Sequence, residues 1–108
     1  PSSPPVMPEL PEYLALKIIY RPRVELKPSP RNARTHSEMQ IIKIRDSVAR
    51  FGFITPILID GHDEIVAGHG RYIAAERLGM AKVPTIPIGH LSADEIRAYR
   101  LADNRLAE

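Results

Sequence analysis

The hairpin pattern between residues 56 and 67 constrains how this chain folds more than any other feature. Two apolar runs, residues 56–60 and 64–67, flank a Gly-His-Asp segment, which is typical of two strands joined by a tight turn. Residues 68–71 (Gly-His-Gly-Arg) follow at once, and helix-forming residues come after them. The glycine motif is therefore predicted to lie at a strand-to-helix junction.

A long amphipathic helix is predicted before the hairpin. Thr35 and Glu38 have capping-box spacing, and Gly52 stands where a left-handed C-terminal cap belongs. The residues expected on its core-facing stripe are Ile41, Ile44, Val48 and Phe51.

Two more helices are predicted after the hairpin. The first covers residues 72–78 and ends at Gly79. Its residues expected to face the core are Ala74, Ala75 and Leu78. The second opens with a capping box from Ser92 to Glu95 and continues through about residue 104.

Two further strands complete the pattern. Residues 23–27 alternate and precede a Pro-Ser-Pro loop, so they predict a short strand. Residues 83–88 alternate around Pro84 and Pro87, and because proline cannot donate to a central ladder, this strand is predicted at a sheet edge. The order of elements indicates an α/β (α+β) fold, a compact domain with a small mixed sheet covered by helices.

Length and composition indicate one soluble domain with an arm. A chain of 108 residues with 44% hydrophobic content can bury one core. Residues 1–16 begin with a Pro- and Ser-rich stretch without signal-peptide order, so we expect a disordered or linker arm before a domain at residues 17–108. The apolar runs are too short to span a membrane. The absence of cysteine excludes disulfides, thiolate zinc sites and a cysteine nucleophile, and fits a reducing cytoplasm.

Basic residues are concentrated in one half of the chain. Residues 17–50 hold nine basic and three acidic side chains, whereas residues 51–108 hold six basic and eight acidic ones. The first half is therefore expected to attract phosphate. The residues expected to contact a DNA backbone are Arg31, Lys43, Arg45 and Arg50. Ordinary solvated helix faces are the alternative for most of these charges.

The Gly-His-Gly-Arg segment predicts phosphate binding. Gly68 and Gly70 permit a sharp turn and close backbone approach, and the following helix start offers unpaired N–H groups. Arg71 adds a charge-assisted contact to the same anion. A structural turn with a solvent-facing arginine is the alternative for so short a motif.

Several motifs in a fixed order resemble the N-terminal domain of ParB-type partition proteins, in the ParB/sulfiredoxin superfamily. They include Asn-Ala-Arg at 32–34, Phe-Gly at 51–52, Thr-Pro-Ile-Leu-Ile at 55–59, Ile-Val-Ala-Gly-His-Gly-Arg at 65–71 and Leu-Ala-Asp-Asn at 101–104. The resemblance covers most of residues 23–108. The likeness extends to the version of this domain at the front of phage-type and bacterial DNA methyltransferases, which implies a bacterial or phage-infected cell.

The resemblance also implies a ligand and the residues that hold it. Residues of the glycine motif (Gly68, His69, Gly70 and Arg71) are in the position that binds nucleotide phosphates, so CTP or ATP with magnesium is the implied cofactor. By the same comparison, Asn32 and Arg34 lie near the other end of the ligand. Asp103 and Asn104 are the implied magnesium ligands, with an exposed helix end as the alternative.

Two departures from the family pattern limit the analogy. CTP-binding partition proteins usually carry Gly-Glu-Arg-Arg where this chain has Gly-His-Gly-Arg, and Gln and Arg where it has Leu106 and Ala107. These differences speak against CTP hydrolysis. The 108 residues contain no helix-turn-helix, so we do not expect them to read a DNA sequence, and we expect the domain to be a fragment or a stand-alone version.

Three functional alternatives stay open. The preferred one is a nucleotide-binding, DNA-associated domain, with partition machinery or a DNA methyltransferase as partner and no membrane. The second is a nucleotide-dependent enzyme (a kinase, NTPase or nuclease), for which His69 and Glu64 are the catalytic candidates. Against a nuclease, a solvated turn explains Asp60, Asp63 and Glu64 better than a two-metal site does. The third is a homodimer or methylase-docking domain whose loop binds nothing.

Overall fold

The computed structural model describes residues 16–29 and 36–106, and in the last helix it describes side chains as far as Leu101. The elements in chain order are β1 (Ile19–Pro22), the 3-10 helix η2 (Arg23–Glu25), α2 (Glu38–Phe51), β2 (Ile57–Ile59), β3 (Ile65–Ala67), α3 (His69–Arg77), β4 (Lys82–Pro87) and α4 (Ala93–Leu106). All but the last residue of the expected N-terminal arm lies outside the described ranges. Within those ranges, no helix is both long and apolar enough to cross a lipid bilayer.

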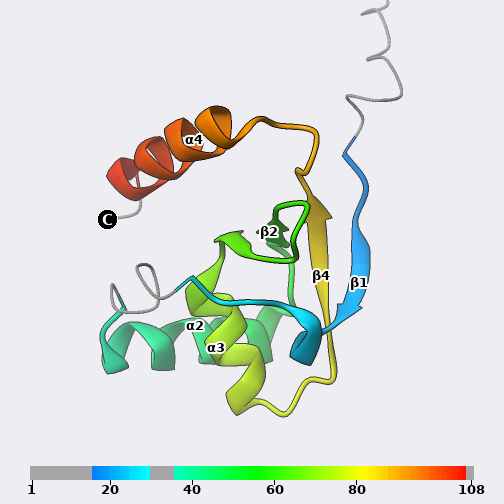
Figure 1. The fold of residues 1–108 in the computed structure, drawn as a ribbon. Helices are drawn as coiled ribbons and strands as arrows, with labels where there is room; N and C mark the ends of the chain where they lie inside the picture. Colours follow the sequence, from blue (N-terminus) through cyan, green and yellow to red (C-terminus); the bar gives the residue numbers. More distant parts are fainter. Residues whose placement is uncertain (1–15, 30–35, 107–108) are drawn as a thin grey trace, which may run out of the picture.

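The four strands form one mixed sheet in the order β1-β4-β2-β3. Strand β4 is antiparallel to β1 and parallel to β2, and β2 and β3 form an antiparallel hairpin. Figure 1 shows α2 and α3 together below the sheet and α4 above it. The predicted fold class and order of elements are confirmed, and this order places the start of α3 directly after β3.

The core lies where the sheet meets α3. Its strand residues, each at most 1% exposed, are Ile57, Ile59, Ile65 and Val83. Burial of each such side chain stabilises the fold by about 1.5–3 kcal/mol. The small, fully buried Ala75 of α3 belongs to the same cluster. The alternation in β2 thus buries both of its isoleucines and fixes which face of the hairpin meets α3.

Three predicted local features are confirmed. The hairpin turn joins β2 to β3, and Gly79 has a φ of +70° just after α3. Ser92 and Glu95 form a reciprocal box, because the Ser92 N–H donates to Glu95 Oε1 (2.9 Å) and the Glu95 N–H donates to Ser92 Oγ (3.1 Å).

The strand predicted at residues 23–27 is wrong. The strand in this region is β1, which ends at Pro22, and residues 23–25 form the turn η2. Because β1 and β3 occupy opposite edges of the sheet, the chain must turn here to cross from one edge to the other. Lys27 then pairs with Glu64 as an isolated parallel bridge beside β3.

The predicted N-terminal cap of α2 is two residues too early. The observed box joins Ser37 and Gln40, with the Gln40 N–H donating to Ser37 Oγ (3.2 Å) and the Ser37 N–H donating to Gln40 Oε1 (2.9 Å). The pairs Thr35–Glu38 and Ser37–Gln40 both have the spacing of a capping box, and the sequence alone does not show which pair forms it. Thr35 itself lies outside the described residues. At the other end, Gly52 is the C-cap at the predicted position with a positive φ of +86°, but its ψ of 175° is extended and not that of the predicted left-handed cap.

Two residues predicted to face the core do not. Phe51 is 59% exposed and Leu78 is 38% exposed. Each stands directly before the glycine that ends its helix, so no further helical turn covers it. The ring of Phe51 instead lies 4.9 Å from the guanidinium carbon of Arg50, a cation–π contact.

Strand β4 is central, not at an edge as predicted. The Ile88 N–H donates to Ile59 O of β2 (2.8 Å). Because the backbone nitrogens of successive strand residues point alternately to the two neighbouring strands, the nitrogen of Pro84 also faces β2 and the nitrogen of Pro87 faces β1. Pairing with β2 begins only at Thr85, and pairing with β1 stops at Thr85. Each proline therefore turns its nitrogen to a side where the ladder is absent.

Candidate functional site

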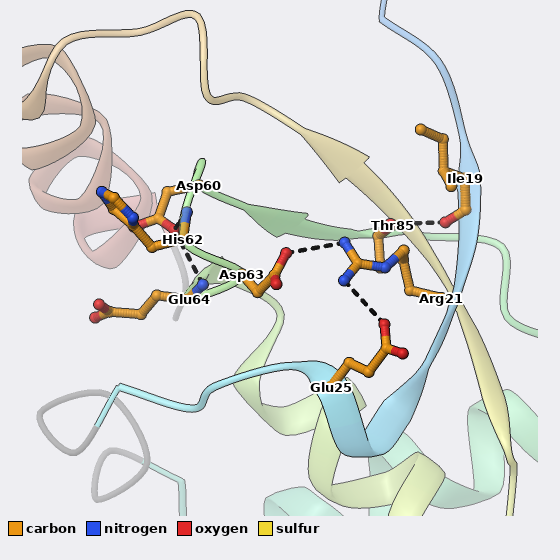
Figure 2. Close-up of polar contacts among 8 residues, drawn as sticks. All are labelled: Ile19, Arg21, Glu25, Asp60, His62, Asp63, Glu64 and Thr85. Atoms are coloured by element: carbon orange, nitrogen blue, oxygen red, sulfur yellow. Dashed lines mark hydrogen bonds and ion pairs between the residues drawn. The ribbon is translucent and has the colours of Figure 1, made fainter.

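The hairpin turn uses its acidic side chains for its own structure (Figure 2). Asp60 Oδ1 accepts the N–H groups of His62 (2.8 Å) and Glu64 (3.0 Å). Asp63 has a φ of +64° and accepts from Arg21 Nη1 (2.9 Å), which lowers the pKa of Asp63. Among the described residues no group of three His, Cys, Asp or Glu side chains is placed to hold a metal ion.

Gly68 makes the junction between β3 and α3. It is the N-cap of α3 with a φ of +101°, where other residues are strained. A Cβ added there would lie 3.1 Å from Arg71 Nη2 and 3.2–3.3 Å from two atoms of Ile57. The predicted strand-to-helix junction is confirmed, and it requires glycine at this position.

Gly70 lets α2 pack against the first turn of α3. An added Cβ would lie 2.5 Å from Ile44 Cδ1 and 3.1 Å from Nε2 of His36. A larger residue here would displace both side chains. Glycine at this position therefore permits a close contact between the start of α3 and the N-terminal part of α2.

Arg71 is one of the residues that line a groove of about 270 Å³ beside the start of α3. Its Nη2 lies 3.5 Å from the carbonyl oxygen of Pro56, the residue before β2. The groove, called the Arg71 groove below, is lined by Lys43, Ile44, Ser47, Val48, residues 52–55 and Arg71. Its lining combines apolar side chains with two cations and two hydroxyl groups, so it offers charge-assisted contacts to an anion.

His69 is buried, with 4% of its surface exposed. Its Nε2 accepts the backbone N–H of Ser29 (3.1 Å), so the neutral ring carries its proton on Nδ1. Burial, and then the nearby charges of Arg100 and His36, lower the pKa of His69 from 6.5 to about 4. The imidazole is therefore neutral at pH 7, and its acceptor nitrogen is occupied by Ser29.

Arg100 ties α4 to the hairpin. Its Nη2 lies 3.4 Å from Glu64 Oε1 and 3.3 Å from the carbonyl oxygen of Ile65. A cleft of about 500 Å³ lies between α4 and the turn, and Ser29 and Arg100 are among its lining residues. Glu64, a catalytic candidate from sequence, thus pairs with an arginine.

The other predicted site residues are only partly brought together. Asp103 and Asn104 lie about one turn beyond Arg100 on α4, where the described side chains have ended. Arg31, Asn32 and Arg34 lie outside the described residues. On α2, Lys43 lines the Arg71 groove, Arg45 pairs with Asp46 (3.1 Å) and Arg50 stacks on Phe51.

Sequence reasoning missed Ser29, Ser47, Thr55 and Arg100 as site residues. Ser29 lies in the Pro-Ser-Pro loop and Thr55 in the Thr-Pro-Ile-Leu-Ile motif, but no local pattern showed which side chains they meet. Lys43 was expected to contact DNA, and its position beside Arg71 depends on how α2 packs on α3.

Comparison with known proteins gives a family and relatives. The family described as the ParB N-terminal domain matches residues 17–105. The chain is 49% identical over 80 residues to the ParB-like nuclease domain-containing protein YnaK of Escherichia coli K12, covering 74% of this chain and 92% of that protein. It is 34% identical over 80 residues to the probable chromosome-partitioning protein ParB of Rickettsia bellii, covering 73% of this chain but only 28% of that protein.

Solved structures show the same fold. The chromosome-partitioning protein ParB of Caulobacter crescentus, complexed with CTP-gamma-S, matches with a TM-score of 0.71 and 26% identity over 82% of this chain and 52% of that one. Sulfiredoxin of Arabidopsis thaliana matches with a TM-score of 0.62 and 18% identity over 79% and 97%. A free serine kinase in complex with AMP matches with a TM-score of 0.60 and 22% identity over 80% and 38%.

Proposed function

The chain belongs to the ParB N-terminal domain family, and from that premise we propose that it is a nucleotide-binding, DNA-associated domain whose ligand phosphates lie at the start of α3. The proposal commits to Gly68, His69 and Gly70 as backbone contacts and to Arg71 as the charged one. Asn32 and Arg34 are proposed at the other end of the ligand.

The Arg71 groove is the observation that carries this proposal. Arg71 and Lys43 line it together with Ser47 and Thr55, so the lining side chains include two cations and two hydroxyl groups. Arg71 stands in the first turn of α3, where backbone N–H groups have no partner within the helix and the helix dipole is positive. Of α3, Arg71 is the residue that lines the groove, so a phosphate bound there would meet Arg71 and Lys43, and the backbone N–H groups of residues 68–70 are proposed as further contacts.

The nucleotide is proposed from the relatives. The Caulobacter protein is a complex with CTP-gamma-S, and a fold neighbour is a complex with AMP. We propose CTP or ATP, with magnesium held by oxygens of Asp103 and Asn104. Magnesium favours oxygen ligands and usually keeps several waters, so two protein oxygens are a sufficient set.

The geometry supports binding better than catalysis. The acceptor nitrogen of His69 is engaged by Ser29, and a pKa of about 4 removes the imidazolium form at neutral pH. Glu64 pairs with Arg100. A nucleotide-dependent enzyme remains the alternative proposal, and it would require both residues to exchange these partners.

DNA is the proposed macromolecular partner. Lys43, Ser47 and Arg50 lie at positions i, i+4 and i+7 of α2 and so share one face of the helix. Contacts from this face would go to the phosphate backbone and would weaken with salt. A partition complex or a DNA methyltransferase is the proposed larger assembly, with a homodimer as the proposed unit.

Titration followed by backbone amide NMR tests the proposal. CTP, ATP and a short DNA duplex are each added with magnesium to the native protein, to Arg71→Ala and to Lys17→Ala. Lys17 precedes β1, at the edge of the sheet opposite β3, so its variant controls for charge alone. We expect one nucleotide to shift the amides of residues 68–72 in the native and Lys17→Ala proteins but not in Arg71→Ala.

Two other outcomes would contradict the proposal. Shifts spread along α2 with DNA alone would leave a DNA-associated domain without a nucleotide site. Unchanged amides with every ligand would favour a dimerisation or docking domain instead.

A further inference from the structure

A short stretch of parallel pairing joins residues 27–29 to β3. The Lys27 N–H donates to Asp63 O (2.8 Å), and the Ile65 N–H donates to Lys27 O (2.9 Å). In a regular parallel ladder the next bond would run from the Ser29 N–H to the carbonyl of Ile65. A bond from the Ser29 N–H to Ile65 O would therefore continue the parallel pairing by one step.

Two side chains take the place of this next bond. The Ser29 N–H donates to His69 Nε2 (3.1 Å), and Arg100 Nη2 donates to Ile65 O (3.3 Å). Both backbone groups therefore keep a partner, but one partner comes from the first residue of α3 and the other from α4. The parallel pairing of residues 27–29 with β3 therefore ends at Ser29, where the side chain of His69 attaches the start of α3.

We infer that His69 is a positioning residue, which holds the first turn of α3 against Ser29 so that its backbone N–H groups stay aimed at the anion. This role rests on the function proposed above. Gly68, the N-cap of α3, has a positive φ that glycine adopts without strain, and it has no side chain that could fix the start of the helix. His69, the first residue of α3, is therefore the first residue whose side chain can anchor this turn.

Burial makes the anchor hard to replace. Ser29 is 5% exposed and His69 is 4% exposed, so water does not readily substitute for the bond. Without the imidazole, the Ser29 N–H would be a buried donor whose regular acceptor, Ile65 O, is already used by Arg100. The segment would have to shift relative to β3, and the first turn of α3 would lose its tether.

The side chain at residue 69 needs an acceptor at the place of Nε2. Glutamine offers Oε1 at a similar reach and remains neutral, whereas leucine offers similar volume and no acceptor. His69→Gln and His69→Leu are therefore a matched pair. Ser29→Pro removes the donor instead and leaves His69 in place, and its neighbours Pro28 and Pro30 already favour extended backbone.

The test measures the anchor and the ligand separately. Amide hydrogen exchange of Ser29 reports the hydrogen bond, and titration with inorganic pyrophosphate or with CTP and magnesium reports the site through the amides of residues 68–72. We expect Ser29 protection to be lost in His69→Leu and kept in His69→Gln. Affinity is expected to fall about tenfold in His69→Leu and Ser29→Pro, the scale of one lost hydrogen bond, and to return toward native in His69→Gln.

Each outcome decides one proposal. Equal Ser29 protection in all His69 variants would overturn the anchor, and lost protection with unchanged affinity would overturn the positioning role. If the native protein binds neither pyrophosphate nor nucleotide, the proposed function fails, and with it the positioning of a ligand site, while the exchange data still show whether His69 holds Ser29. Should His69→Leu not fold, Ser29→Pro makes the same comparison from the other side of the bond.

Discussion

The hairpin turn and the Arg71 groove are both charged regions, but the turn brings opposite charges together whereas the groove brings together two side chains of the same sign. In the turn, Asp60 is bonded to backbone N–H groups and Asp63 to Arg21, which also pairs with Glu25 (3.1 Å). In the groove, two cations, Lys43 and Arg71, line the same hollow. A region whose charges are mutually paired stabilises a conformation, whereas a region that gathers one sign of charge is available for a ligand.

The two regions differ also in the origin of their residues. Asp60 and the two N–H groups it accepts come from five consecutive residues of one turn. The groove combines α2, the loop before β2 and the first turn of α3. Substitutions in the turn should therefore change stability with little effect on binding, and substitutions in the groove should do the reverse.

The largest expected effect concerns the pH dependence of stability at the start of α3. The pKa of His69 is about 4 in the folded protein against 6.5 for the free side chain, so the unfolded chain takes up the proton first as pH falls. The free energy of unfolding should be full above pH 6.5 and should decline between pH 6.5 and 4 by an amount on the order of 3 kcal/mol.

Urea unfolding at pH 7, 5.5 and 4.5 measures this decline. The His69→Gln variant has no imidazole to protonate at this position and should show a smaller loss over the same range. An identical slope in the native and variant proteins would place the titrating group elsewhere.

The next largest effect is expected on the stability of the hairpin turn. Asp60→Ala removes the acceptor of two backbone N–H groups and should lower the free energy of unfolding by about 1–2 kcal/mol. Asp60→Asn keeps an Oδ1 acceptor and should lose less. Denaturant unfolding measures both, and nucleotide affinity should stay within twofold of native (about 0.4 kcal/mol) in each variant. A large fall in affinity in Asp60→Ala would break the separation between the regions.

A smaller effect is expected on the groove side. Lys43→Gln removes one of the two cations from the Arg71 groove and should weaken nucleotide binding about fivefold, roughly 1 kcal/mol, because this exposed charge is screened by solvent. Its effect on unfolding should be within about 0.5 kcal/mol, as for most surface substitutions. Isothermal titration at low and high salt measures the change, with Lys17→Gln as the charge-matched control. Equal affinities in the two variants would remove Lys43 from the site.

The smallest effect concerns Asp63 in the turn. Its pairing with Arg21 lowers the pKa of the carboxyl group, so the stabilisation is present above the ordinary value of 3.8 and is lost as pH falls through the lower, folded value. Asp63→Asn should therefore slightly flatten the acid side of the stability profile below pH 4. Thermal unfolding between pH 2.5 and 5 measures it. A steeper acid limb in the variant would contradict the pairing.

Predictions succeeded where neighbouring residues decide the structure. The hairpin, the Ser92 cap and the junction at Gly68 each depend on a few consecutive residues, and each is present. Prediction failed for the strand at residues 23–27 and for the edge placement of β4. Both depend on which strand lies beside which, and the rule that proline avoids central strands does not say to which side each proline nitrogen points.

Local chemistry in the sequence therefore determined the secondary structure around the glycine motif, the cap at Ser92, and the expectation that the start of α3 binds phosphate, whereas at α2 it left two caps possible. Only the tertiary structure decided that Lys43 meets Arg71 in one groove, that His69 holds Ser29, and that Arg100 reaches Ile65. The reason is physical: caps and tight turns close hydrogen bonds over two to four residues, whereas these contacts join residues 28 to 40 positions apart, which the packing of the helices on the sheet brings together.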